Sequence, residues 1–316
     1  MIHVHLEGGE VTVRESPVPE PARGQALLRL LRGGICNTDL ELLRGYYGFT
    51  GTPGHEFVAE VTAAPDPRLL GRIVVGGINL ACGKCPSCAQ DMGRHCPRRT
   101  VLGIVKHPGA FAEFFTLPVQ NLHVIPSQVP LEHATFAEPV AAACEILDQV
   151  PIPAGSTAAV LGDGKLGLLC AQTLALNGIK VHLFGRHRRK LRVAEALGVE
   201  GRMVKKPPRA SYRYVVEATG SAAGLEQAVF MTQSRGTVIL KSTVHEKVLI
   251  GTAPVVVNEI TLVGSRCGRL EPALKLLRSG KLNLDAMIDD VLPLREARRA
   301  FARAQEKGVL KVLLAA

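Results

Sequence analysis

Four closely spaced cysteines form the most specific chemical pattern in the sequence. Cys82, Cys85, Cys88 and Cys96 follow the pattern Cys-x2-Cys-x2-Cys-x7-Cys. Four thiolates at this spacing can surround one Zn²⁺ ion in a closed tetrahedron, which leaves no position for a substrate. We therefore predict a structural zinc site. The alternatives are an iron–sulfur cluster, which four cysteines also hold, and disulfides, which are typical of small secreted proteins.

Further side chains suited to a metal are dispersed in three short segments. These segments are Gly34-Ile35-Cys36-Asn37-Thr38-Asp39, Gly54-His55-Glu56-Phe57 and Ala137-Glu138-Pro139. Together they offer a thiol, a hydroxyl, an imidazole and several carboxylates. Each segment alone is uninformative, because a single Cys or His is more often a core residue than a ligand. Only their combination indicates a site.

A glycine-rich turn predicts dinucleotide binding. The segment Gly162-Asp163-Gly164-Lys165-Leu166-Gly167 has the pattern G-x-G-x-x-G, follows an apolar run at 157–161 and opens an apolar helix at 165–177. In this context the glycines allow a tight turn, close approach of a pyrophosphate, and close packing of helix on strand. The helix N-terminus then offers its free amides to the phosphates. An ordinary strand–helix turn is the alternative.

The end of the next strand bears on which dinucleotide binds. NAD sites usually place an acid there to accept hydrogen bonds from the ribose hydroxyls. Residues 183–190 read Leu-Phe-Gly-Arg-His-Arg-Arg-Lys, with no acid and five residues that can be cationic. A 2′-phosphate needs charge-assisted donors, and Arg supplies a planar fork of them. We therefore favour NADP over NAD, with Arg186 and Arg188 as its contacts; a basic helix start facing solvent is the alternative.

The pattern of predicted strands and helices changes near residue 156. Before it, short β-like runs at 26–31, 57–62, 72–75 and 111–117 are separated by turn signals, and one helix is expected at 139–150. After it, strands at 157–161, 180–184, 214–217 and 237–241 alternate with helices at 165–177, 188–197 and 224–231. This alternation predicts an α/β domain with a parallel sheet covered on both faces. Two helices, at 272–279 and 294–307, precede a last strand at 309–314.

Composition limits the classes of protein to consider. The chain has 316 residues, which suffices for two domains, and 47% of them are hydrophobic. We find no apolar run long enough to span a membrane and no signal-peptide pattern, and therefore expect a cytoplasmic protein. The net charge of +10 is compatible with a nucleic-acid partner, but no nucleic-acid motif accompanies it. We interpret the charge as an Arg-rich solvated surface, with no nucleic-acid or membrane partner.

The order of the motifs resembles that of the medium-chain dehydrogenase/reductase superfamily, in its zinc-containing alcohol and polyol (sorbitol-, threonine- and glucose-type) dehydrogenase branch. The resemblance covers nearly the whole chain. Besides the segments quoted above, its landmarks are Gly109-Ala110-Phe111-Ala112-Glu113, Asn121-Leu122-His123 and Glu217-Ala218-Thr219-Gly220. Agreement across so many separated motifs is specific.

The resemblance implies a GroES-like, β-rich catalytic domain with a four-cysteine zinc lobe at about residues 80–100, together with a Rossmann domain that has a doubly wound parallel sheet. The implied limits are 1–150 for the catalytic domain, 151–266 for the Rossmann domain and 267–316 for the return to the catalytic domain. Homodimers or homotetramers are the expected assemblies.

The resemblance also implies the roles of individual residues. Cys36, His55 and Glu138 match the ligands of a catalytic zinc ion, and Glu56 lies next to the metal and can exchange as a ligand. Thr38 is similar to the hydroxyl that moves the alcohol proton, and Asp39 to a group that supports the ligands. The implied dinucleotide contacts are Gly162, Gly164, Lys165, Leu166, Gly167, Arg186, Arg188 and Thr219.

The function expected from this resemblance is hydride transfer between an alcohol or polyol, or its carbonyl, and NADP(H) or NAD(H), with one catalytic and one structural zinc ion. Two alternatives remain. One is a zinc-independent quinone or enone reductase of the same superfamily, and the other is a non-enzymatic zinc-containing binding protein. The sequence departs from the family where Asn37 replaces an Arg that often contacts the pyrophosphate, and Lys165 is our candidate to replace that contact.

Overall fold

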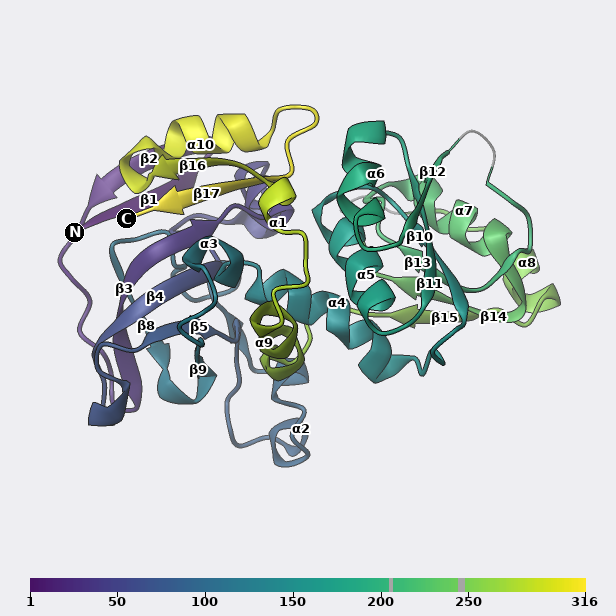
Figure 1. The fold of residues 1–316 in the computed structure, drawn as a ribbon. Coiled ribbons are helices and arrows are strands. Elements are labelled where there is room, and N and C mark those ends of the chain that lie inside the picture. Colours follow the sequence, from purple (N-terminus) through teal and green to yellow (C-terminus); the bar gives the residue numbers. More distant parts are fainter. Residues whose placement is uncertain (205–206, 244–247) are drawn as a thin grey trace. The chain divides into compact units, whose positions relative to one another are not determined.

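The computed structural model describes residues 1–204, 207–243 and 248–316, which fold into two compact units (Figure 1). The first unit comprises Met1–Glu138, Ala273–Gly280 and Ile288–Ala316, and the second comprises Pro139–Pro272 and Lys281–Met287. Both ends of the chain therefore belong to the first unit. The limits expected from the sequence, 1–150, 151–266 and 267–316, stay a prediction, because compact units need not coincide with domains. In the described part of the chain, no helix is long and apolar enough to cross a membrane.

The first unit is built on a seven-stranded sheet. Its order is β16-β17-β3-β4-β5-β9, and β8 also pairs with β3. The strands are β3 (Gln25–Gly34), β4 (Glu56–Ala63), β5 (Ile73–Gly76), β8 (Phe114–Pro118), β9 (Leu122–Val124), β16 (Ile288–Pro293) and β17 (Lys311–Ala315). Two-stranded sheets pair β1 (Ile2–Glu7) with β2 (Glu10–Glu15) and β6 (Asn79–Leu80) with β7 (Thr100–Val101).

Alternation of side chains explains how the central strand β3 forms the core. Ala26, Leu28 and Leu30 are buried, because successive residues of a strand point to opposite faces of the sheet.

The helices of this unit are short. They are α1 (Asn37–Leu43), α2 (Pro86–Ala89), α3 (Leu131–Ala134) and α10 (Ala297–Ala304). The 3-10 turns are η1 (Tyr46–Gly48), η2 (Pro67–Leu69), η3 (Gly93–His95), η4 (Val119–Asn121) and η6 (Leu294–Glu296). α4 (Ala137–Gln149) and α9 (Leu270–Arg278) each belong partly to both units.

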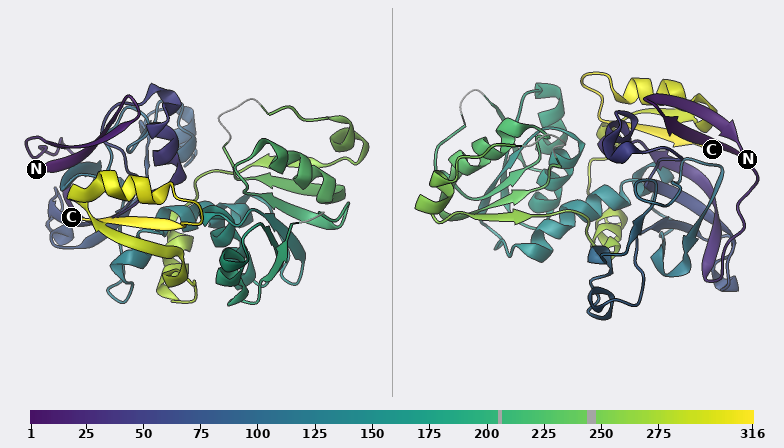
Figure 2. Two further views of the ribbon diagram at one scale, coloured as in Figure 1. Left: turned by 90° about the horizontal axis from the view of Figure 1, so that it is seen from above. Right: turned by 180° about the vertical axis from the view of Figure 1, so that it is seen from behind.

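The second unit contains a six-stranded sheet in which all pairs are parallel, in the order β12-β11-β10-β13-β14-β15. Its strands are β10 (Thr157–Leu161), β11 (Lys180–Gly185), β12 (Glu200–Met203), β13 (Tyr212–Glu217), β14 (Thr232–Leu240) and β15 (Thr261–Gly264). Its helices are α5 (Lys165–Leu176), α6 (Arg188–Glu195), α7 (Ala222–Met231) and α8 (Ala253–Val257), with the turn η5 (Asp285–Met287). They lie on both faces of the sheet (Figure 2). The doubly wound fold expected from the sequence is therefore confirmed.

Two strands of this sheet were not predicted. β12 has the sequence Glu-Gly-Arg-Met, which shows no apolar pattern. β15 has exposed residues at three of its four positions because it forms one edge of the sheet. β14 also begins before the predicted strand at 237–241. Edge and polar strands are specified by their neighbours rather than by their own composition, so periodicity alone misses them.

Candidate active site

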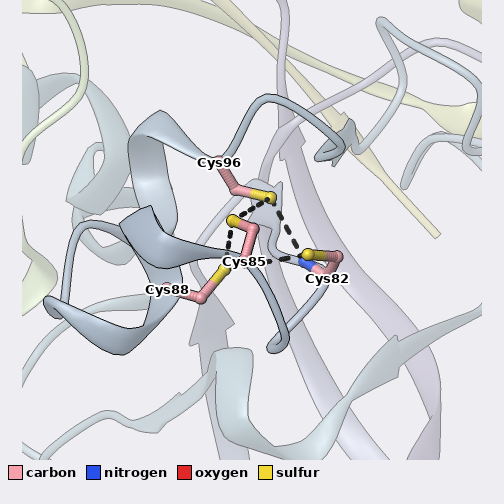
Figure 3. A group of neighbouring side chains, drawn as sticks. All are labelled: Cys82, Cys85, Cys88 and Cys96. Atoms are coloured by element: carbon pink, nitrogen blue, oxygen red, sulfur yellow. Dashed lines mark hydrogen bonds between the residues drawn. The ribbon is translucent and has the colours of Figure 1, made fainter.

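Four thiols converge in the loop that contains α2. The Sγ atoms of Cys82, Cys85, Cys88 and Cys96 all lie within 4.8 Å of one another and point toward a common centre (Figure 3). The Sγ of Cys85 is 3.4 Å from that of Cys88 and 3.7 Å from that of Cys96, and the Sγ atoms of Cys82 and Cys88 are 4.0 Å apart. A tetrahedron with Zn–S bonds of about 2.3 Å has edges of about 3.8 Å, so these four residues fit a zinc ion.

Local turns produce this convergence. Cys85 is the N-cap of α2, whose first residue is Pro86, and η3 lies between Cys88 and Cys96. A hydrogen bond from the Lys84 amide lowers the pKa of Cys82 to about 6, whereas burial raises that of Cys88 to about 11. None of the eight cysteines, all of which lie in the described part of the chain, forms a disulfide, so the structure does not contain the disulfide alternative.

A second group contains Cys36, His55 and Glu56. One ligand atom of each lies within 4.8 Å of the other two. Cys36 is the N-cap of α1, directly after β3, and His55 precedes the first residue of β4. β3 and β4 are antiparallel neighbours in which Gly34 pairs with Glu56, so the end of one strand lies beside the start of the other. The sheet itself thus assembles the three side chains.

Asp39 contacts two of the three residues that form this group. It is fully buried, accepts hydrogen bonds from the Cys36 amide at 2.8 Å and the Gly54 amide at 3.2 Å, and its Oδ1 lies 3.4 Å from Nδ1 of His55. Burial acts to lower the pKa of His55, but the Asp39 carboxylate more than offsets it, so that the pKa is raised. A carboxylate that orients a histidine in this way is typical of metal sites. Nδ1 of His55 itself has no well-formed hydrogen bond with any described residue.

The remaining predicted residues near this group are Thr38 and Glu138. The Oγ1 of Thr38 lies 3.8 Å from the Sγ of Cys36. Glu138 is half-buried in the first turn of α4 and is not part of the group of three. The structure therefore brings together Cys36, His55, Glu56 and Thr38, and leaves Glu138 outside the group.

Lys311 is a member of this environment that the sequence analysis missed. Its ammonium donates a hydrogen bond to Oε2 of Glu56, and both residues are 1% exposed. Burial acts to lower the pKa of Lys311, but the Glu56 carboxylate more than offsets it, so that the pKa is raised. The sequence does contain a signal for Lys311, because it is the single cation within the otherwise apolar run at 309–314. A charge that such a strand buries needs a partner of opposite charge.

The second unit holds the glycine turn. Gly162 has φ of 111°, and a Cβ there would lie 2.4 Å from the carbonyl oxygen of Ala218. A Cβ at Gly167 would lie 2.0 Å from the carbonyl oxygen of Gly162. Space around Gly164 is open. The turn therefore requires glycine at its ends and leaves room in its middle, directly before Lys165 and Leu166 at the start of α5. This shape suits a pyrophosphate.

Two further loops lie at the same edge of this sheet, because β10 has β11 and β13 as its parallel neighbours. After β11, Arg186 and Arg188 are exposed, and Arg188 forms an ion pair with Glu195 at 2.6 Å. After β13, the hydroxyl and amide of Thr219 both donate to Oε1 of the buried Glu217, at 2.6 and 2.7 Å. All predicted dinucleotide contacts thus lie in the turns that follow β10, β11 and β13 or in the first turn of α5 and α6, within one unit.

Comparisons with known proteins agree with this arrangement. Residues 22–127 match the alcohol dehydrogenase GroES-like domain family, which confirms the GroES-like prediction. D-altritol 5-dehydrogenase from Agrobacterium fabrum is 31% identical over 98% of both chains, and sorbitol dehydrogenase from Halalkalibacterium halodurans is 24% identical over 97% of this chain and 96% of its own.

Solved structures show the same fold over the whole chain. A zinc-binding dehydrogenase from Sinorhizobium meliloti, solved with NADP, superposes with a TM-score of 0.91 and 30% identity, covering 100% of this chain and 99% of its own. An alcohol dehydrogenase from Thermus sp. ATN1 has a TM-score of 0.91, 29% identity and the same coverage. The chain belongs to the medium-chain dehydrogenase/reductase superfamily, in its zinc-type alcohol and polyol dehydrogenase branch.

Proposed function

We propose that this NAD(P)-dependent alcohol dehydrogenase uses two zinc ions and oxidises a secondary hydroxyl of a polyol or sugar-type substrate. The structural ion is assigned to Cys82, Cys85, Cys88 and Cys96, and the catalytic ion to the group at Cys36 and His55. The observation that carries the proposal is the convergence of Cys36, His55 and Glu56 within 4.8 Å, next to the hydroxyl of Thr38. A thiol, an imidazole and a carboxylate are donors that zinc accepts.

We assign the third protein ligand of the catalytic ion to Glu138, with Glu56 as the residue that exchanges with it. Glu56 is close to Cys36 and His55, but its carboxylate is already paired with the buried ammonium of Lys311. Breaking that pair to bind metal would leave Lys311 without its counter-charge, which is costly in a buried environment. Glu138 lies half-buried in the first turn of α4, at the position that matches the family's third ligand.

The residues of the first unit then have distinct tasks. A zinc ion bound here supplies a Lewis acid that lowers the pKa of the alcohol, and the dinucleotide supplies the acceptor for the hydride. Oγ1 of Thr38 would accept the proton of the substrate hydroxyl while the Thr38 hydroxyl gives up its own proton toward solvent. Asp39 holds the Cys36 backbone through a hydrogen bond and places its carboxylate beside the His55 ring, which would keep both donors oriented toward a bound ion.

NADP is the cofactor we favour over NAD. β11 ends at Gly185 without an acid, and the exposed Arg186 follows it. The relative from Sinorhizobium meliloti was solved with NADP. The polyol class of substrate is inferred from relatives named for D-altritol and sorbitol.

We further propose a homodimer formed through the edge strand β15, or a homotetramer built from such dimers. Leu262 on β15 and Val256 and Val257 on α8 are exposed apolar side chains, at 39%, 72% and 79% of their surfaces. Exposed apolar groups beside an unpaired strand edge favour association with a second copy.

We propose the cytoplasm as the location of the protein. Cysteines that form no disulfide suit a reducing compartment.

Metal analysis with a substrate panel tests the proposed function. Purified protein is expected to carry two zinc ions per chain and to oxidise one or more polyols with NADP or NAD. A chelator that removes the ion at Cys36 should abolish this activity. Activity that survives complete loss of that ion would instead favour the zinc-independent quinone or enone reductase. Absence of any dinucleotide binding would favour a non-enzymatic zinc protein.

A further inference from the structure

Asp163, in the middle of the glycine turn, contacts the loop that follows β11. Its Oδ2 accepts hydrogen bonds from the backbone amides of Arg186 at 2.8 Å and His187 at 2.7 Å. The same oxygen lies 3.0 Å from Nδ1 of the His187 ring. All its hydrogen bonds with described residues use Oδ2, and 11% of the side-chain surface is exposed. Oδ1 therefore keeps its capacity to accept a further hydrogen bond.

The backbone is shaped to admit this carboxylate. β10 and β11 are parallel neighbours, and the Gly162 amide donates to the carbonyl oxygen of Phe184 at 2.8 Å, so the two turns begin side by side. A Cβ at Gly185 would lie 2.6 Å from both Cβ and Oδ2 of Asp163. Only glycine at 185 leaves this space. The acid from the first turn consequently reaches the point where β11 ends.

Opposite charges therefore meet at the end of β11. Asp163 contributes a carboxylate, and Arg186 contributes an exposed guanidinium that has no ion-pair partner among residues 1–204, 207–243 and 248–316. Arg188 is already paired with Glu195. A ribose 2′-hydroxyl can donate a hydrogen bond to a carboxylate, whereas a 2′-phosphate is repelled by it and attracted by an arginine.

We propose that Asp163 determines cofactor specificity by supplying, from the glycine turn, the acidic group that the end of β11 lacks. The site then binds NAD(H) as well as NADP(H), with Asp163 favouring the first and Arg186 the second. This inference rests on the proposed function, because it concerns the dinucleotide site of the same dehydrogenase. The preference for NADP(H) stays, and Asp163 adds the capacity to bind NAD(H) at the same site.

Direct binding of NADH and NADPH tests the inference. The chain contains no Trp, so binding is read from calorimetry or from nicotinamide fluorescence. Asp163→Asn keeps an oxygen that accepts from the loop amides and removes the charge. We expect it to weaken NADH binding about tenfold, because the hydrogen bond from the ribose hydroxyl to a charged acceptor is lost. NADPH binding should stay the same or tighten, because a negative charge near the 2′-phosphate is removed. Arg186→Gln should shift the ratio of the two dissociation constants in the opposite direction.

Glu200→Gln is the matched control, because it removes one negative charge from an exposed residue of β12 in the same unit and should leave the ratio unchanged. If Asp163→Asn weakens both dinucleotides equally, Asp163 only holds the loop, and the inference is wrong. It is also wrong if the variant leaves both affinities unchanged. Wild-type protein that binds neither dinucleotide would instead refute the proposed function, whatever Asp163 does.

Discussion

Lys311 and Glu56 form an ion pair between two strands from opposite ends of the chain, 255 residues apart. Their side chains are only 2% and 1% exposed. The ammonium also lies 3.5 Å from the carbonyl oxygen of Ile35 and 5.4 Å from the ring centroid of Phe136. Because β17 and β4 both pair with β3, the ion pair joins two strands that flank the central one. Through Glu56, the ion pair adjoins Cys36 and His55.

Removal of the lysine charge should be strongly destabilising. Lys311→Met leaves the Glu56 carboxylate buried without its partner, and breaking a buried pair in this way costs about 3–5 kcal/mol. Urea unfolding of the metal-free protein, followed by circular dichroism, measures the loss.

The double variant Lys311→Met with Glu56→Gln should recover much of this loss, because no unpaired charge then remains. Lys307→Met is the matched control for the substitution itself, since Lys307 is exposed on the surface of the same unit. An effect of Lys311→Met no larger than that of the control would show that the pair contributes little.

The sequence predicted the parts of the fold that depend on local pattern. Strand–helix alternation and the glycine turn located β10, α5 and β11, and the cysteine spacing located the four-cysteine group. It did not locate Lys311 or Asp163 as members of the sites. Their partners are set by strand pairing, which brings β17 beside β3 and the first two turns of the second unit side by side. Such pairings join distant segments, and composition within one segment contains no information about them.

Removal of one thiol should empty the structural site. Cys96 is fully buried and its Sγ accepts a hydrogen bond from the Cys82 amide at 3.5 Å. We expect Cys96→Ser to lower the zinc content by one ion per chain and to reduce stability, because metal binding contributes folding free energy. Mass spectrometry of the metal and thermal unfolding provide the two readouts. Cys267→Ser, which alters a half-buried thiol outside both groups, should leave the zinc content at its wild-type value. An unchanged content in Cys96→Ser would contradict the assignment.

Asp39→Asn should weaken the other zinc site without emptying the four-cysteine lobe. The single oxygen of the amide can still accept from the Cys36 backbone, but the oxygen that faces the Gly54 amide and His55 is replaced by an NH2 group and the charge is lost. Loss of a supporting carboxylate typically lowers metal affinity about 10–100-fold. Competition with a chromophoric chelator resolves the two ions and measures this change. Equal affinities in the variant and the wild type would mean that Asp39 serves only the backbone.

Thr38→Val tests the proton path while leaving the metal in place. Valine has nearly the shape of threonine and removes only the hydroxyl, whose Oγ1 lies 3.8 Å from the Sγ of Cys36. Loss of a group that moves a proton in the reaction lowers kcat about 10²–10⁴-fold. We expect a loss in this range for polyol oxidation, together with zinc content and dinucleotide affinity equal to those of the wild type. Thr62→Val, on β4 in the same sheet, is the matched control and should retain full activity. If Thr38→Val keeps its kcat, another group must carry the proton from the substrate hydroxyl.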